Sequence, residues 1–252
     1  MRVLHSALLE RHGFRHGFAT RVGGVSAAPF DTLNLGFHLG DDDDAVRQNR
    51  LRFVRSLGLS IEQLFEQRQV HGNEVREVTS SDDTEEIQNR EGDALVARDV
   101  GIAVAARTAD CVPVLLAHPP SGDVAAVHAG WRGAVAGVVG RAVVAMKQPP
   151  AELVAAIGPH IRVGAFEVGE EVARELELAS KRRPVVERGA DKPHGDLAAL
   201  IRLQLLDRGL PSTAIDDVGG CTHDEPDLFF SHRRDRGKTG RHLSVIVARP
   251  SR

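Results

Sequence analysis

The chain has few of the features that mark secreted or membrane proteins. Its 252 residues include two cysteines, Cys111 and Cys221, which form no CxxC pair. A disulfide framework is therefore not expected, and a thiol or metal role in a reducing compartment fits the sequence better. No apolar run approaches the roughly 18 residues that a membrane span requires, and residues 1–5 resemble no secretory segment. These absences predict a cytoplasmic protein with no membrane partner.

Nucleotide and nucleic-acid signatures are also missing. Neither the GxxxxGK[ST] phosphate loop nor the GxGxxG dinucleotide motif occurs in the sequence. The formal net charge of −3 argues against a nucleic-acid-binding surface spread over the protein. The common nucleoside-triphosphate and dinucleotide enzymes, and nucleic-acid partners, are therefore disfavoured.

The apolar pattern predicts the fold. With 42% hydrophobic residues the chain can bury a large core, and we expect one domain over residues 1–252. Short β-branched runs predict strands and helical periodicity predicts helices. The predicted strands are 17–20, 93–97, 102–107, 112–118, 124–128, 154–157 and 243–247, and the predicted helices are 43–57, 133–147, 168–179 and 196–208. This order predicts an α/β (α+β) sandwich with mixed sheets flanked by helices, with 80–90 and 181–193 as exposed, mobile connections.

Three residues at the ends of apolar runs could share a site. Cys111 precedes the run 112–116, and His128 ends the next run along the chain. Consecutive strands are often neighbours, so the thiol and the imidazole could approach one another. Together with His71, they would make an open zinc site with a position left for water or substrate. Taken alone, Cys111 is better explained as a buried core thiol, and it is His128 that favours a site.

Two further patterns have a functional and a structural interpretation. The turn Gly130-Trp131-Arg132-Gly133 precedes a predicted helix, where free N–H groups and an arginine suit an anion. Tight turning alone would explain both glycines equally well. The acidic run Asp41–Asp44 lacks the spacing of a calcium loop, so we interpret it as complementing a helix dipole.

Ten short motifs occur along the chain in an order that is specific when taken together. They are Thr20–Ser26, Leu33–Gly36, Asn49–Arg50, Gln69–Gly72, Thr108–Cys111, His128–Gly133, Ile157–Pro159, Phe166–Gly169, Cys221–Thr222 and Phe229–Arg234. With them the chain resembles the YfiH-like family, also called the laccase-domain or polyphenol oxidoreductase family, from about Phe18 to Val247. The resemblance implies a single CNF/YfiH-like α/β sandwich domain.

The resemblance also implies an activity and a set of site residues. It implies a catalytic zinc held by His71, Cys111 and His128, although copper could also bind such ligands in vitro. The implied reactions are phosphorolysis of adenosine, inosine, guanosine and methylthioadenosine, and deamination of adenosine. Asp110 is the candidate to carry a proton or support a metal ligand, although it could simply cap a turn. The predicted substrate-binding residues are Arg50, first choice for phosphate, and Asn34, Gln69, Arg132, Cys221, Arg233 and Arg234.

Three other functions compete with this one. A cysteine hydrolase would use Cys111 as nucleophile and His128 as base, with His71 lining the pocket. The family resemblance also implies a cell-wall editing role for some bacterial members. A multicopper laccase fits less well, because none of the 12 histidines forms the His-x-His pairs typical of such enzymes. The sequence does not predict the oligomeric state.

Overall fold

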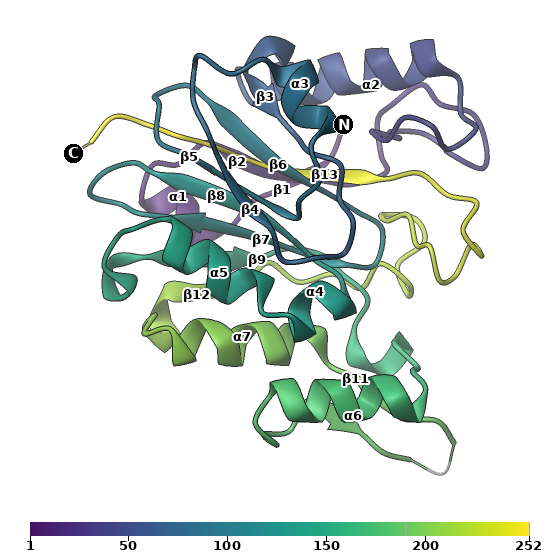
Figure 1. Ribbon diagram of the computed structural model, residues 1–252. Coiled ribbons are helices and arrows are strands. Elements are labelled where there is room, and N and C mark those ends of the chain that lie inside the picture. The colour runs from purple at the N-terminus through teal and green to yellow at the C-terminus, as the bar shows by residue number, and fades with distance from the viewer. Residues whose placement is uncertain (190, 252) are drawn as a thin grey trace.

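The computed structural model describes residues 1–189 and 191–251, and it contains two sheets packed face to face (Figure 1). The six-stranded sheet consists, in spatial order, of β12 (Ile215–Asp217), β9 (Val154–Ile157), β7 (Val112–Ala117), β8 (Val124–Ala129), β5 (Ala94–Ala97) and β4 (Val75–Val78). The five-stranded sheet consists of β1 (Val3–Leu4), β2 (His16–Ala19), β13 (His242–Val247), β6 (Ala103–Thr108) and β3 (Leu64–Phe65). A small ribbon pairs β10 (Val186–Glu187) with β11 (His194–Gly195).

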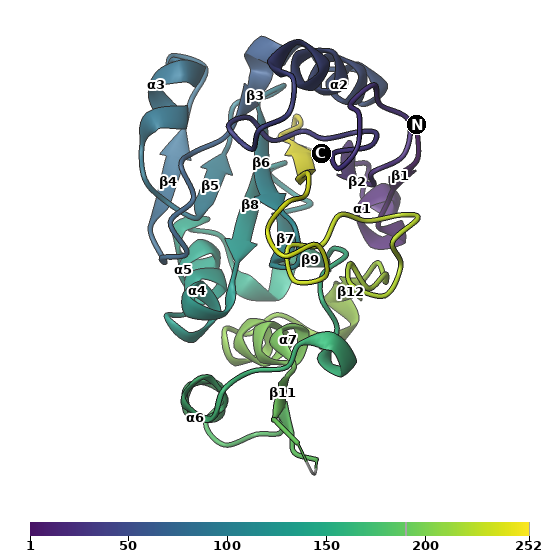
Figure 2. The same cartoon turned by 90° about the vertical axis from the view of Figure 1, so that its right-hand side faces the viewer.

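Helices cover the outer faces of both sheets. They are α1 (Ala7–Arg11), α2 (Asp43–Ser56), α3 (Thr84–Asn89), α4 (Trp131–Val135), α5 (Val138–Ala145), α6 (Glu170–Ala179) and α7 (Leu197–Asp207). The α2 helix covers the five-stranded sheet, and α4, α5 and α7 cover the six-stranded sheet (Figure 1). The α6 helix and the β11 strand extend beyond α7 (Figure 2). None of the helices in the described residues is long and apolar enough to cross a membrane.

Side chains that point alternately to the two faces of each strand create three apolar layers. In β5, Val96 faces the helices α5 and α7, whereas Leu95 and Ala97 lie between the two sheets. In β13, Val245 packs under α2, whereas Ile246 lies between the sheets. Because successive side chains of a strand point to opposite faces, one short apolar run supplies two cores. Runs that are apolar at every position are therefore expected in this sandwich.

The predicted fold class is confirmed. Both large sheets are mixed: β9 with β12, β4 with β5 and β3 with β6 are parallel pairs, and the other pairs are antiparallel. The predicted helix over 43–57 corresponds to α2, and Asp42 caps it by accepting from the N–H groups of Asp44 and Ala45. This contact agrees with the interpretation of the acidic run as a helix start.

Two local predictions are wrong. The helix predicted over 133–147 is divided into α4 and α5, because Gly137 adopts a left-handed backbone with a φ of 78°. The connection predicted over 80–90 contains α3, which begins where Asp83 accepts hydrogen bonds from two backbone N–H groups. The connection predicted over 181–193 includes β10, and its residue Ala190 lies outside the described residues.

A three-residue turn joins the two sheets and positions the site. The turn, residues 109–111, connects β6 of the five-stranded sheet to β7 of the six-stranded sheet. Its neighbours are the N-terminal end of β13, where His242 pairs with Thr108, and the C-terminal end of β8, where His128 pairs with Pro113. Residues that are far apart in sequence therefore meet at this end of the sandwich.

Candidate functional site

Cys111 is the last residue of the turn between the sheets. The preceding residue, Asp110, has a φ of 89°, a backbone conformation that aspartate tolerates better than most residues. Its carboxylate accepts a hydrogen bond of 2.7 Å from the Thr222 hydroxyl and one of 2.6 Å from the Arg233 backbone N–H. Asp110 therefore fastens the turn to the segment 222–233 and fixes the half-buried Cys111 thiol at its end.

His128 is buried near the end of β8 and has a carboxylate partner. Its Nδ1 atom lies 2.8 Å from Oδ1 of Asp93, which stands directly before β5. The Asp93 backbone also accepts a hydrogen bond of 2.8 Å from the His128 N–H. Both contacts hold the imidazole in one orientation and leave its Nε2 atom for another partner.

The same aspartate holds the loop that carries His71. Its side chain accepts hydrogen bonds from the backbone N–H groups of Val70, His71 and Gly72 at 3.3, 3.0 and 2.7 Å. His71 has a φ of 60°, and the three N–H donors enclose the carboxylate. Burial would raise the pKa of Asp93, but these bonds and His128 outweigh it and lower the pKa.

The three side chains form a compact group of metal ligands. One ligand atom from each of His71, Cys111 and His128 lies within 4.8 Å of the others, and Cys111 Sγ is 3.8 Å from His71 Nε2. Ligands of one tetrahedral zinc lie roughly 3–4 Å apart, given metal–ligand distances of about 2.0–2.3 Å. The donor set of two imidazoles and one thiolate fits zinc and also copper. The described part of the chain contains one group of this kind.

The electrostatics of the group favour the thiolate. Burial alone would raise the pKa of Cys111, but the charge of His128 and hydrogen bonds from both histidines lower it to about 6. Burial alone would lower the pKa of His128, but Cys111 and Asp93 raise it to about 9. The metal-free group is therefore a thiolate beside an imidazolium at neutral pH. A metal ion binds such a thiolate directly and displaces the imidazolium proton.

Two glycines let α4 approach this group. A Cβ on Gly130 would lie 2.6 Å from His71 Cδ2 and 3.1 Å from Cys111 Sγ. A Cβ on Gly133 would lie 2.7 Å from the Gly72 carbonyl oxygen. Gly130 has a φ of −70°, so neither tight turning nor an unusual backbone explains it. The close approach of α4 to the His71 loop explains both glycines.

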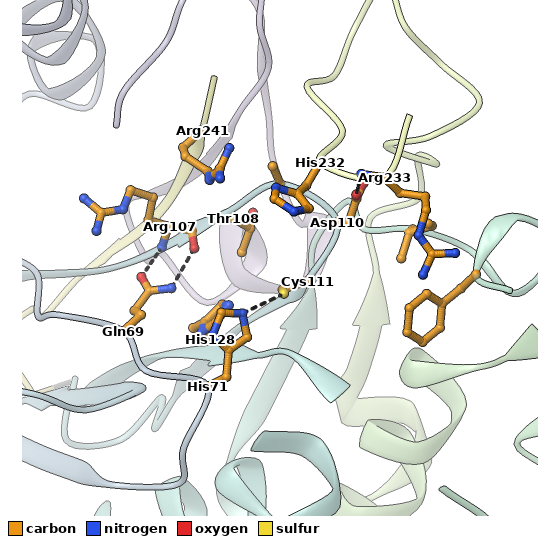
Figure 3. A pocket seen from close by; sticks show the side chains of 13 residues that line it. Gln69, His71, Arg107, Thr108, Asp110, Cys111, His128, His232, Arg233 and Arg241 are labelled. Carbon is orange, nitrogen blue, oxygen red and sulfur yellow. Dashed lines mark hydrogen bonds between the residues drawn. The ribbon is translucent and has the colours of Figure 1, made fainter. Parts of the chain in front are cut away.

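The ligand group lies at the wall of a cavity of about 340 Å³ (Figure 3). This volume is in the range of small-molecule sites. Six of the residues singled out in the sequence line it: Gln69, His71, Asp110, Cys111, His128 and Arg233. Four further polar residues of the lining were not predicted: Arg107, Thr108, His232 and Arg241. Apolar surface is contributed by Ala109, Ile161 and Phe166.

Arg50 lies elsewhere. Its guanidinium forms a buried ion pair with Glu66, donates to the Leu35 carbonyl oxygen at 2.8 Å and lies over the Phe37 ring. Arg50, Glu66 and Phe37 line a separate hollow under α2, and Arg50 does not line the cavity beside Cys111. The contacts of Arg50 are those of a structural residue.

Four other predicted substrate-binding residues also lie outside the lining of this cavity. Asn34 is fully buried and bonds to Gly36 and the backbone of Arg241. The Cys221 thiol contacts Asp224 at 3.2 Å. Arg132 is exposed, with its guanidinium 4.3 Å from the Trp131 ring centre, and Arg234 donates to the backbone carbonyls of 222, 223 and 229.

The sequence held weak signals for the residues that were missed. Asp93 follows Gly92 at the start of a buried strand, a position where an acidic residue requires a partner. Arg107 interrupts the apolar pattern near the end of β6, and Arg241 directly precedes β13. A buried or half-buried charge at a strand end is a signal for a site, but the sequence does not indicate which charges meet.

A family model and several known proteins are similar in sequence to this chain. A family model described as multi-copper polyphenol oxidoreductase laccase matches residues 15–249. The protein named purine nucleoside phosphorylase YfiH from Escherichia coli (strain K12) is 38% identical over 231 residues, covering 90% of this chain and 91% of the relative. A protein from Streptomyces coelicolor named purine nucleoside phosphorylase is 42% identical over 233 residues, covering 91% and 93%.

Solved structures agree with these similarities. The crystal structure of YlmD from Geobacillus stearothermophilus has a TM-score of 0.87 and 36% identity, covering 93% of this chain and 91% of that one. The crystal structure of a Bacillus licheniformis protein called YfiH has a TM-score of 0.86 and 30% identity, covering 93% and 92%. The fold is therefore shared over nearly the whole length of each chain.

Proposed function

The chain belongs to the family described as multi-copper polyphenol oxidoreductase laccase, and we propose that it is a purine nucleoside phosphorylase that uses one zinc ion. The observation that carries the proposal is the convergence of His71, Cys111 and His128 at the wall of a cavity. The names of its relatives support the reaction class. The one ligand group found among the described residues supports one metal ion, whereas a multicopper oxidase needs several copper centres.

The proposed reaction cleaves the glycosidic bond of a purine nucleoside. A phosphate oxygen forms a bond to C1′ of the ribose while the C1′–N9 bond breaks, its electron pair goes to the purine, and the purine takes up a proton. Bound zinc would supply Lewis acidity at His71, Cys111 and His128. The proposed substrates are adenosine, inosine, guanosine and methylthioadenosine.

The protein's own residues prepare the site for this reaction. Asp93 holds the ring of His128 and the backbone of the loop that carries His71, and both histidines line the cavity. Asp110 has both oxygens engaged, by Thr222 and Arg233, so we assign it a positioning role in place of proton transfer. Gln69 accepts from the Arg107 N–H and donates to its carbonyl oxygen, both at 2.7 Å, which fixes that wall of the cavity.

Adenosine deamination is the proposed second activity of the same site. A water oxygen bonds to C6 of the purine and the C6–N6 bond breaks. One proton of the water leaves with the amino group as ammonia, and the other stays on the purine ring as the C6 carbonyl forms. The cavity is large enough for small-molecule ligands, and its arginines and histidines offer hydrogen-bond donors to the purine edge. This activity needs no phosphate, so the two reactions can be separated by assay.

Liquid chromatography of nucleosides incubated with zinc-loaded protein tests both reactions. Phosphate-dependent release of the free base is expected for phosphorolysis, and inosine formed from adenosine is expected for deamination. The two cysteines provide a matched pair: Cys111→Ser should lose zinc and turnover, whereas Cys221→Ser should retain zinc, because Cys221 lies outside the ligand group. No base release with or without phosphate would reject the phosphorylase proposal.

A cysteine hydrolase is the second candidate, and one observation favours it. Cys111 has a pKa of about 6 beside His128, which is the arrangement of an activated thiolate nucleophile. Metal content and thiol alkylation separate the two functions. Stoichiometric zinc that protects Cys111 from iodoacetamide supports the phosphorylase, whereas an active, metal-free protein inactivated by iodoacetamide supports the hydrolase.

A further inference from the structure

Two arginines that the metal ligands do not use lie together at one wall of the cavity. Arg107 pairs with Leu243 across the antiparallel β6 and β13 strands, and Arg241 stands two residues before Leu243. Side chains two residues apart on a strand share a face, and diagonal neighbours across a strand pair are within reach of long side chains. Arg107 and Arg241 therefore lie side by side where the core beneath α2 ends (Figure 3).

Neither guanidinium is neutralised by a carboxylate in the cavity. Among the described residues, the Arg107 guanidinium donates no hydrogen bond to another residue, and the Arg241 guanidinium donates only to the carbonyl oxygens of Thr239 and Gly240, both at 3.0 Å. The carboxylate in the described lining of the cavity is Asp110, and both of its oxygens are engaged elsewhere. Two half-buried cations thus face the cavity, and within the described residues neither guanidinium forms an ion pair with a carboxylate.

The two charges also repel one another. Burial lowers the pKa of Arg241 and the charge of Arg107 lowers it further, whereas the charges of Cys111 and Asp110 act in the opposite direction and offset part of this effect. The charge of Arg107 helps to lower the pKa of Glu66, but Glu66 forms its buried ion pair with Arg50 under α2. An anion between the two guanidinium groups would relieve this repulsion, because each can present two parallel N–H donors to one oxyanion.

We propose that Arg107 and Arg241 form the subsite for inorganic phosphate in this cavity. The assignment rests on the proposed phosphorylase function, for which phosphate is the attacking substrate. The arginine pair and the metal ligands line the same cavity, so phosphate held by the pair would lie next to a nucleoside bound beside Cys111. Phosphate carries up to two negative charges near neutral pH and has oxygens enough for both guanidinium groups.

Other arginines fit this role less well. Arg50 has Glu66 as its partner and lies in a separate hollow. Arg233 lines the cavity but donates to the Glu167 carbonyl oxygen at 2.8 Å and lies over the Phe166 ring. In Figure 3, Arg233 lies on the side of the metal ligands opposite Arg107 and Arg241. That position suits contact with the nucleoside.

The test compares Arg107→Gln and Arg241→Gln with Arg174→Gln, a control on the exposed surface of α6. Isothermal titration with inorganic phosphate measures binding without turnover, and phosphorolysis measures the KM for phosphate. Each cavity variant should weaken phosphate binding and raise this KM about ten- to hundredfold, because a charge-assisted hydrogen bond contributes roughly 1.5–3 kcal/mol. Zinc content and nucleoside KM should change little, and Arg174→Gln should match the wild type.

The outcomes separate this inference from the proposed function. If the wild type phosphorolyses nucleosides and both cavity variants keep its phosphate KM, the subsite is wrong and the function stands. If the wild type releases no base but binds phosphate through the two arginines, the subsite stands and the function fails. If a nucleoside 5′-monophosphate displaces phosphate from the two arginines and is itself consumed as a substrate, the assignment to inorganic phosphate is overturned. Thermal melting identifies a variant that merely misfolds. Arg107→Lys keeps the positive charge and should recover part of the phosphate binding that Arg107→Gln loses.

Discussion

Asp93 and His128 are joined twice, by a 2.8 Å contact between Oδ1 and Nδ1 and by a 2.8 Å hydrogen bond between their backbones. The same carboxylate accepts from the backbone of His71. One buried aspartate therefore positions two of the three candidate metal ligands, which come from different parts of the chain. Such carboxylate–histidine contacts orient the ring and raise its basicity as a ligand.

Removing the charge of Asp93 should weaken metal binding while the three ligands remain. Asp93→Asn should reduce zinc affinity about ten- to hundredfold, because the partner of a metal-bound histidine typically has an effect of this size. Competition with a zinc chelator measures the change. Asp99→Asn is the matched control, since Asp99 is only partly buried and contacts Ser80 away from the site. Equal zinc affinity in both variants would contradict the role assigned to Asp93.

A methyl group at Gly130 should disrupt the ligand group. In Gly130→Ala the new Cβ would collide with His71 and Cys111, so zinc content should fall sharply, and overpacking should lower the free energy of unfolding by about 1–3 kcal/mol. Elemental analysis and urea unfolding measure the two effects. Gly164→Ala is the control, because no heavy atom lies within 4 Å of its added Cβ. Full zinc occupancy in Gly130→Ala would show that the loops move aside.

Arg50 should matter chiefly to stability. Arg50→Ala leaves the buried Glu66 without its ion-pair partner, which should cost about 3–5 kcal/mol in the free energy of unfolding. A double variant, Arg50→Met with Glu66→Leu, should recover much of this loss, because it removes both charges. Urea unfolding measures the series. If Arg50→Ala remained as stable as the wild type but lost phosphate use, Arg50 would be the phosphate ligand that the sequence predicts.

Stability should fall with acid partly because of His242. Burial and the charges of Arg21 and Arg241 lower its pKa to about 3, from an ordinary value of 6.5. Below pH 6.5 this histidine binds a proton in the unfolded chain but stays neutral in the folded protein. The free energy of unfolding therefore falls as the pH decreases toward about 3. The slope from one such group is at most about 1.4 kcal/mol per pH unit.

The variant His242→Gln tests this acid dependence. Glutamine can still accept the hydrogen bond that the Phe230 N–H donates to His242, but it does not titrate. Urea unfolding as a function of pH should therefore show a shallower decline for this variant. His38→Gln, on an exposed residue, should keep the slope of the wild type. Equal slopes in the wild type and His242→Gln would mean that other groups account for the acid sensitivity.

The fold class and most of the longer elements could be predicted from sequence, since their pattern is local. Apolar runs such as 93–97 and 124–128 correspond to buried strands, and the helices over 43–57 and 196–208 follow the 3.6-residue period. Strands of two or three residues, such as β1 and β12, were missed because a run that short has no readable period. The single domain over residues 1–252 stays a prediction.

The candidate site could likewise be predicted from the sequence only in part. The sequence alone selected His71, Cys111 and His128 as candidate ligands, and motif order related them to a family. Only the tertiary structure decided that Asp93 holds two of them and that Arg107 meets Arg241. Those contacts depend on strand register and on the turn between the sheets, which bring together residues that are distant in sequence, such as Asp93 and His128 at 35 positions apart. Local chemistry selects the candidates, but a charge acquires its role from the neighbours that folding brings to it.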